Sequence, residues 1–347
     1  MRFYTKPHTF YGGIDLHARP MYRCILNQEG EVFLHRHMKA APEPFLKAIA
    51  PDWEEMVVCV EGMFTWSWLA DLCAQEGIPF VLDHALSMQA IHGGKAQNDT
   101  LDAPKMAVLL RGGMLPQADV YPAERRATRD LLRRRLYLTR KRAALLTHVP
   151  PTNCQYHVPD IGKKIAAKAN RVGGAERFPD PAVQKSLEVD LALSDYDDQR
   201  RRDLELAIVT TAKQHEANTL YLLQTVPGIG KILNLVLLYE LHDLTRFPRV
   251  REFVSYCRLV TCAKESAGKR YGTSGTKIGN AYLTWACSEA AVLCLRNNPA
   301  GQKSLARLEN KHAKGKALTV WAHKLARAVY YMLKRGTAVD MDQWLRG

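Results

Sequence analysis

The spacing of apolar positions over the first 84 residues predicts strands and then alternating helices and strands. Three short runs, FYGGIDLHA, MYRCILNQ and VFLHRHM, alternate apolar with other residues between positions 10 and 38, and turn-forming residues separate them. Such alternation predicts three antiparallel β-strands. The runs that follow predict a helix at 42–50, a strand at 55–62, a helix at 66–77 and a strand at 78–84.

Three antiparallel strands followed by alternating helices and strands describe an RNase H-like mixed sheet, with parallel later strands and helices on both faces. From Pro122 onward Leu and Ala recur every three or four residues, at 123–148 and 186–222, which predicts a long antiparallel helical hairpin. Pro, Gly and Asn are frequent at 149–182, which indicates a connector with one short helix. Residues 223–347 are expected to be mostly helical, interrupted by a Gly- and Ser-rich loop at 262–280.

The fold class expected is therefore α/β plus all-α, in three domains at 1–121, 122–222 and 223–347. No run of eighteen apolar residues occurs, and the first residues lack the apolar core of a signal peptide. We therefore expect a cytoplasmic protein without membrane contact. The eight cysteines are scattered and form no C-x-x-C pair, which favours reduced core thiols over a zinc site or a disulfide framework.

The net charge of +14 is unevenly distributed along the 347 residues. Residues 1–121 carry a balance of −4, whereas residues 122–147 carry +7 and residues 296–335 carry +9. Runs of one sign this long favour a polyanionic partner, and nucleic acid is the leading candidate. The alternative is a set of solvated helix faces.

Four carboxylates of the first domain form a candidate metal site. Asp15 and Glu61 lie in or at the end of apolar strands, where a buried carboxylate needs a cation or a donor. Asp99 and Asp102 are three residues apart at the start of a predicted helix, so they share one helix face. Oxygen ligands from separate elements suit Mg²⁺, as a pair of ions that drives attack on a phosphodiester. On spacing alone, Asp99 as a helix cap and Asp102 as a first-turn acid remain the competing interpretation.

Several segments together carry a family resemblance over roughly residues 10–335. They are GGIDLH with Asp15, CVEGMFTW with Glu61, NDTLDA with Asp99 and Asp102, TVPGIGKILNLVLLYELHDLTRFPRVREFVSYCRLV, and ESAGKRYGTSGTKIGNAYL. In their order and spacing the chain resembles the DEDD transposases of insertion-sequence family one-ten, which are related to the Piv-type DNA invertases. One difference is that members often have Lys-Thr directly before the third-motif aspartate, where this chain has Gln97-Asn98 and places Lys95 further upstream.

The resemblance implies a RuvC-like N-terminal domain with Asp15, Glu61, Asp99 and Asp102 as metal ligands, a coiled-coil insertion, and a C-terminal transposase domain with a nucleophilic serine. It further implies a bridge RNA that guides the protein to donor and target DNA, and dimers that assemble into a tetramer. Matching the glutamate-serine-small-glycine pattern makes Ser266 the counterpart of the catalytic serine, with Ser274 as runner-up. Without the resemblance, a serine in a Gly-rich basic loop is a phosphate-binding or capping residue.

Basic residues are the candidates for nucleic-acid contact. Those near the serines are Lys264, Lys269, Arg270 and Lys277, and the +7 region contributes Arg133 and Arg134. The turn Pro227-Gly228-Ile229-Gly230-Lys231 resembles a helix-hairpin-helix element, whose glycines would let the backbone approach phosphate. An ordinary helix connector is an equal alternative for this turn. Trp321, Tyr330 and Tyr331 are expected to be core aromatics rather than base-stacking residues.

The sequence therefore predicts a Mg²⁺-dependent, serine-using DNA recombinase that excises and inserts its own mobile element. The first alternative is a metal-dependent nuclease or Holliday-junction resolvase that uses water as nucleophile and needs no serine. The second is a non-catalytic nucleic-acid-binding scaffold whose acidic cluster is structural. It predicts no dependence on Mg²⁺.

Overall fold

The computed structural model describes residues 2–49, 55–92, 99–160, 165–274, 278–340 and 344. The chain divides into two compact units, Met1–Glu124 and Arg125–Gly347, which are described separately below. A further division of the helical part at residue 222 stays a prediction. Within the described residues, no helix is both long enough and apolar enough to cross a membrane.

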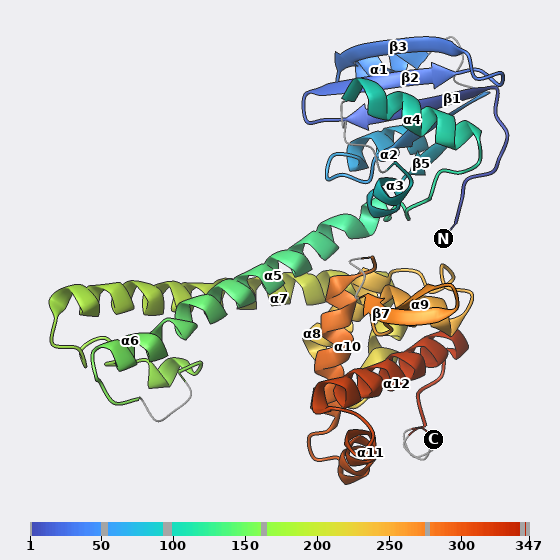
Figure 1. The fold of residues 1–347 in the computed structure, drawn as a ribbon. Coiled ribbons are helices and arrows are strands. Elements are labelled where there is room, and N and C mark those ends of the chain that lie inside the picture. The colour runs from blue at the N-terminus through green and yellow to red at the C-terminus, as the bar shows by residue number, and fades with distance from the viewer. Residues whose placement is uncertain are drawn as a thin grey trace. The chain divides into compact units, whose positions relative to one another are not determined.

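The N-terminal unit is built on a five-stranded sheet in the order β3-β2-β1-β4-β5 (Figure 1). Its strands are β1 (Phe10–Leu16), β2 (Pro20–Leu26), β3 (Val32–Lys39), β4 (Met56–Val60) and β5 (Phe80–Leu82). Strand β2 pairs antiparallel with both β1 and β3, while β4 runs parallel to β1 and β5 parallel to β4. The mixed sheet predicted from the sequence is thus confirmed.

Helices cover both faces of this sheet, as predicted. They are α1 (Pro42–Ile49), α2 (Ser67–Gln75), α3 (Ala85–His92) and α4 (Asp99–Arg111). Successive residues of a strand point to opposite faces, so Val58 of β4 packs with Phe45 of α1 and Leu69 of α2. The neighbouring Val57 packs on the other face with Met106 of α4, together with Met88 of α3.

The C-terminal unit begins with an antiparallel pair of long helices, α5 (Ala123–Thr147) and α7 (Pro181–Gln224), which confirms the predicted hairpin. The direction follows from the ion pairs, because rising numbers in α5 meet falling numbers in α7. These pairs are Arg125–Glu216, Arg135–Glu205 and Arg142–Asp198. The connector holds α6 (Val149–Gln155) and the short 3-10 helix η2 (Lys168–Asn170). Glu216 has non-helical dihedral angles, which place a kink in α7.

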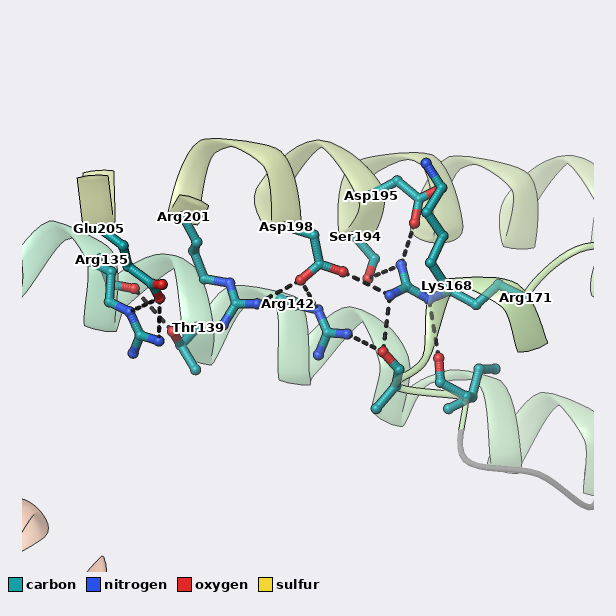
Figure 2. Close-up of polar contacts among 12 residues, drawn as sticks. Arg135, Thr139, Arg142, Lys168, Arg171, Ser194, Asp195, Asp198, Arg201 and Glu205 are labelled. Carbon is teal, nitrogen blue, oxygen red and sulfur yellow. Dashed lines mark hydrogen bonds and ion pairs between the residues drawn. The ribbon is translucent and has the colours of Figure 1, made fainter. Parts of the chain in front are cut away.

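Buried charge fixes the connector against the two long helices (Figure 2). Arg171 of the connector is 5% exposed and donates to Asp198, Asp195 and Ser194 of α7. Partial burial disfavours the charged form of Asp198, but hydrogen bonds from Arg171, Arg142 and Arg201 outweigh it and lower its pKa to about 2. A charge-assisted network of this kind sets the register of the helical pair.

The remainder of the C-terminal unit packs around one apolar core. Its elements are α8 (Lys231–Leu241), α9 (Val250–Tyr256), β6 (Cys262–Ser266), β7 (Lys269–Ser274), α10 (Ala281–Cys294), α11 (Pro299–Glu309) and α12 (Lys314–Arg335). Trp321 and Tyr330 are each 1% exposed, as expected of core aromatics, whereas Tyr331 is 37% exposed. Six of the described cysteines are buried free thiols, and Cys154 is exposed, in contrast to the expectation of core thiols.

The Gly- and Ser-rich segment differs from the predicted loop, because β6 and β7 form an antiparallel hairpin. Its turn consists of Ala267 and Gly268, with φ angles of 50° and 74°. Two consecutive residues at positive φ make the tight turn that matches the twist of paired strands. The turn could not be predicted from the sequence because alanine, the residue at position 267, rarely adopts a positive φ angle.

Candidate active site

A glycine in β1 positions the helix that carries Asp102. A Cβ atom on Gly13 would lie 2.1 Å from the carbonyl oxygen of Ala103 and 2.6 Å from the backbone nitrogen of Ala107. The backbone of α4 therefore rests directly on β1 at this point. Asp15 is two residues after Gly13 and so lies on the same face of the sheet, and Asp102 immediately precedes Ala103. The packing brings the two carboxylates to the same region.

Asp15 comes directly after Ile14 of β1, and Glu61 comes directly after Val60 of β4. Ile14 and Val60 are paired in these two parallel strands, so the two acids occupy neighbouring positions. Asp15 is 6% exposed, and His17 Nε2 lies 3.4 Å from its Oδ1. Burial raises the pKa of Glu61, and the negative charges of Asp15 and Asp102 raise it further, while His17 lowers it. The structure thus gathers three of the four predicted carboxylates closely enough for their charges to interact.

The fourth predicted carboxylate, Asp99, begins α4, but its side chain lies outside the described part of the structure. Asp102 accepts a hydrogen bond of 2.9 Å from Lys105 Nζ. Across the described residues, no three His, Cys, Asp or Glu side chains are already arranged as a metal site. The available donors are hard carboxylate oxygens, the type that Mg²⁺ prefers, so Mg²⁺ binding here stays a prediction.

Asp83 is a further acidic residue at this edge of the sheet, and the sequence analysis missed it. It follows β5 directly, is 1% exposed, and accepts a hydrogen bond of 2.7 Å from the Gly62 backbone nitrogen at Oδ1. Its Oδ2 is buried without a hydrogen-bond partner among the described atoms. Burial, with a smaller contribution from Glu61, raises the pKa of Asp83 to about 7. The signal was present, because Asp83 ends the apolar run IPFVLD as Glu61 ends VVCVE.

Asp83 should make the stability of the N-terminal unit depend on pH. Between about pH 4 and pH 7 the folded protein retains a proton that the unfolded chain has released, so the free energy of unfolding falls as pH rises. Asp83→Asn cannot ionise, so we expect it to raise that free energy by about 4 kcal/mol at pH 8 and little at pH 4. Urea unfolding without divalent cations, with exposed Glu29→Gln as control, measures this. An unchanged pH slope in Asp83→Asn would refute it.

The Ser266 hairpin, defined as residues 262–274, brings together most of the predicted C-terminal site residues. Ser266 pairs directly with Lys269 across the turn, and Glu265 pairs with Arg270. Ser266, Lys264, Lys269 and Arg270 are all exposed. Residues opposite each other in such a pair have neighbouring side chains on one face, so the side chains of Ser266 and Lys269 project from the same face of the hairpin. The hairpin therefore presents the predicted serine on the same face as a basic residue.

Ser274 and Lys277 are described less completely by the structure than Ser266 is. Ser274 ends β7 opposite Cys262, at the far end of the hairpin from the turn. The side chain of Ser274 and all of Lys277 lie outside the described part of the chain. Their predicted roles stay predictions.

Several arginines of the strongly basic helix α5 form ion pairs with acidic residues of the protein itself. Arg125, Arg135 and Arg142 are paired with acids of α7, as described above. Arg133 forms two hydrogen bonds with Glu240 of α8, of 2.7 and 2.8 Å, and Arg134 lies over the ring of Tyr137. From the sequence, the net charge of +7 in this region was expected to bind a polyanion. In the structure, acidic residues that are distant in the sequence neutralise part of that charge. Contacts of Arg133 and Arg134 with nucleic acid stay predictions.

Gly228 packs the turn Pro227-Gly228-Ile229-Gly230-Lys231 against a neighbouring helix. Its φ angle is 87°, and a Cβ atom there would lie 2.4 Å from the Ala290 carbonyl oxygen and 2.5 Å from the Cys294 nitrogen. The turn therefore fits against α10, which supports the connector interpretation. A Cβ on Gly230 would meet no atom within 4 Å, and Lys231 is exposed. Lys231 thus remains accessible to a partner.

Two comparisons place these features among known proteins. Residues 220–306 match a family described as "Transposase IS116/IS110/IS902 family". Over 143 residues the chain is 30% identical to a Streptomyces coelicolor protein named "Insertion element IS110 uncharacterized 43.6 kDa protein". That alignment covers 40% of this chain and 34% of the relative. The chain thus spans about a third of the curated relative, and the family match includes the whole Ser266 hairpin.

Proposed function

We propose that the protein is a transposase that cuts and rejoins DNA at the ends of an insertion element, with the hydroxyl of Ser266 as nucleophile. The observation that carries the proposal is the position of Ser266. It lies on an exposed hairpin, beside Lys269, within the residues that match the transposase family.

The chemistry of the proposed step is a transfer of the phosphodiester. Ser266 Oγ attacks phosphorus and loses its proton, an Oγ–P bond forms, and one P–O bond of the DNA backbone breaks to leave a free hydroxyl. Attack of a DNA hydroxyl on the phosphoserine reverses the exchange, so the strands rejoin without an outside energy source. The ammonium group of Lys269 would stabilise the negative charge that builds on the phosphate oxygens.

We further propose that Asp15, Glu61, Asp99 and Asp102 hold Mg²⁺, as two ions. The mutual repulsion that raises the pKa of Glu61 supports this, because a divalent cation would relieve it. Bound Mg²⁺ would supply Lewis acidity at the phosphate. Ser266 and these carboxylates belong to different units, so the proposal requires both groups to act on the same phosphodiester, from one chain or from two.

The partners proposed are DNA and a guide RNA, with subunits assembling as dimers and a tetramer. The DNA is supported by the family match and by the excess of Lys and Arg, and the RNA and the assembly by the resemblance of the sequence motifs. Sequencing the RNA that copurifies with protein expressed beside its flanking DNA tests the guide. A single structured species encoded by the flank is expected, and a random sample of cellular RNA would contradict guidance.

Covalent trapping tests the nucleophile. We expect the protein, incubated with element-end DNA and Mg²⁺, to form an adduct that survives denaturation and carries the nucleotide on the peptide containing Ser266. Ser266→Ala should give no adduct, whereas Ser274→Ala should give the wild-type amount. Cleaved DNA without any adduct would favour the water-using nuclease, and DNA binding without cleavage would favour the scaffold.

A further inference from the structure

A buried carboxylate of the C-terminal unit, Glu240 on α8, has no place in the chemistry proposed above. It is 3% exposed, and burying a carboxylate is costly unless it is fully paired. Arg133 of α5 donates to both of its oxygens, from Nε at 2.7 Å and from Nη2 at 2.8 Å. The side chain of Asn280 donates to its Oε2 at 2.8 Å. Glu240 therefore joins three segments that are far apart in the sequence.

Asn280 is the residue at which the Ser266 hairpin rejoins the helical core. Its Oδ1 caps α10 by accepting from the backbone nitrogens of Tyr282 and Leu283. Its own backbone nitrogen donates to the Tyr256 carbonyl oxygen at 2.8 Å, and Tyr256 ends α9, before the hairpin begins. Asn280 thus ties the end of the segment that carries the serine to Tyr256, where that segment begins, and it also contacts Glu240. This junction is called the base of the hairpin below.

A second contact closes the same base. Arg258 Nη2 donates to the Gly279 carbonyl oxygen at 2.7 Å. Gly279 has a φ of 105°, and a Cβ atom there would lie 2.5 Å from the Tyr256 carbonyl oxygen. The chain entering the hairpin and the chain leaving it are therefore in direct contact, and the described atoms of the hairpin beyond this base are mostly exposed.

Arg133 extends the connection to the long helical pair. Its guanidinium lies 4.8 Å from the ring centroid of Tyr282, two residues after Asn280. Although burial disfavours the charge of Arg133, the hydrogen bonds and charge of Glu240 raise its pKa. The bidentate geometry with Glu240 fixes the orientation of both side chains. A displacement of α5 would therefore be transmitted to the base of the hairpin.

We infer that Glu240 is a positioning residue for Ser266: it holds the base of the Ser266 hairpin through Asn280 and links that base to helix α5 through Arg133. The inference rests on the proposed function for the role of Ser266. The contacts of Glu240 with Asn280 and Arg133, called the clamp below, are a property of the protein alone. Loss of the clamp leaves the serine present but poorly oriented, which slows attack on phosphorus more than it weakens DNA binding.

The test uses the full-length protein and two readouts, with Glu240→Gln as the first variant. We expect amide hydrogen exchange over residues 262–274 to accelerate about tenfold or more, because a charge-assisted hydrogen bond is lost. We expect the rate of Ser266 adduct formation at saturating DNA to fall by about tenfold or more, with the Kd for DNA unchanged. The milder Arg133→Lys, which cannot form the bidentate pair, should show a smaller change in the same direction.

The chain offers a matched control on the same helix. Arg135 also donates two hydrogen bonds to a glutamate, both to Oε1 of Glu205 of α7. Among the described residues, no hydrogen bond or ion pair joins Arg135 to the base of the hairpin. Arg135→Gln should therefore lower the thermal stability while leaving exchange in the hairpin and the adduct rate unchanged. A general loss of packing would affect both variants alike.

A double variant provides a rescue. In Glu240→Gln with Asn280→Asp, the amide at position 240 can donate to the carboxylate at position 280, and the carboxylate can still cap α10. Slower exchange and faster adduct formation than in Glu240→Gln alone would support the clamp. Wild-type exchange in Glu240→Gln would overturn it, whether or not the protein forms an adduct. Absence of any wild-type adduct, with accelerated exchange in Glu240→Gln, would instead refute the proposed nucleophile and leave the clamp standing.

Discussion

Asp15→Asn and Glu61→Gln are each expected to reduce Mg²⁺-dependent DNA cleavage by at least about a thousandfold while leaving DNA binding intact. Each substitution keeps the shape of the side chain but removes one of the charges that would hold the cation. DNA affinity should persist because the exposed basic residues lie elsewhere, for example on the Ser266 hairpin. Cleavage of labelled element-end DNA over a Mg²⁺ titration, with affinity measured by anisotropy, gives both quantities.

Unfolding should not account for this loss of cleavage. Without metal, the charges of Asp15 and Asp102 raise the pKa of Glu61, so these groups repel one another. Neutralising one of them relieves repulsion and should leave the metal-free protein at least as stable. Glu55→Gln, at the exposed position just before β4, is the control and should cleave normally. Undiminished cleavage in either Asp15→Asn or Glu61→Gln would eliminate the proposed metal site.

The directions of the strands could be predicted because local patterns indicate them. Alternating residues marked β1, β2 and β3, and intervening helices require β4 and β5 to run parallel to β1. Asp15 and Glu61 could be found in the same way, since an acid at the end of an apolar strand is conspicuous. The same reasoning, applied to Asp83, would have identified a further acidic residue at the carboxyl edge of the sheet.

Long-range partners could not be predicted from local patterns. The charge of α5 looked available for phosphate because Glu205, Asp198 and Glu240 are distant in the sequence. Gly228 shows the same limit: from the sequence, a phosphate contact and a helix connector were equal alternatives, and only the position of α10 reveals why a side chain would not fit there. Sequence shows that a residue is small or charged, but the fold determines what lies against it.

Gly13→Ala is expected to destabilise the N-terminal unit by at least about 3 kcal/mol and to impair Mg²⁺-dependent cleavage. The added Cβ would lie 2.1 Å from the Ala103 carbonyl oxygen and 2.6 Å from the Ala107 nitrogen, and both atoms belong to the backbone of α4. Backbone cannot move aside as a flexible side chain can, so α4 must shift as a whole. The shift would disturb the packing of Ala103 and Ala107 against Cys24 and would displace Asp102 from Glu61.

The preceding glycine of the same strand provides the control. A Cβ on Gly12 would point to the other face and meet Val58 Cγ1 at 3.2 Å, a side-chain contact that small adjustments relieve. Gly12→Ala should therefore cost about 1 kcal/mol or less and leave cleavage intact. Urea unfolding of both variants and a Mg²⁺ titration of cleavage separate the two glycines. Equal stability of Gly13→Ala and Gly12→Ala would mean that α4 is not held on β1, and the approach of Asp102 to Asp15 and Glu61 would then lose its structural basis.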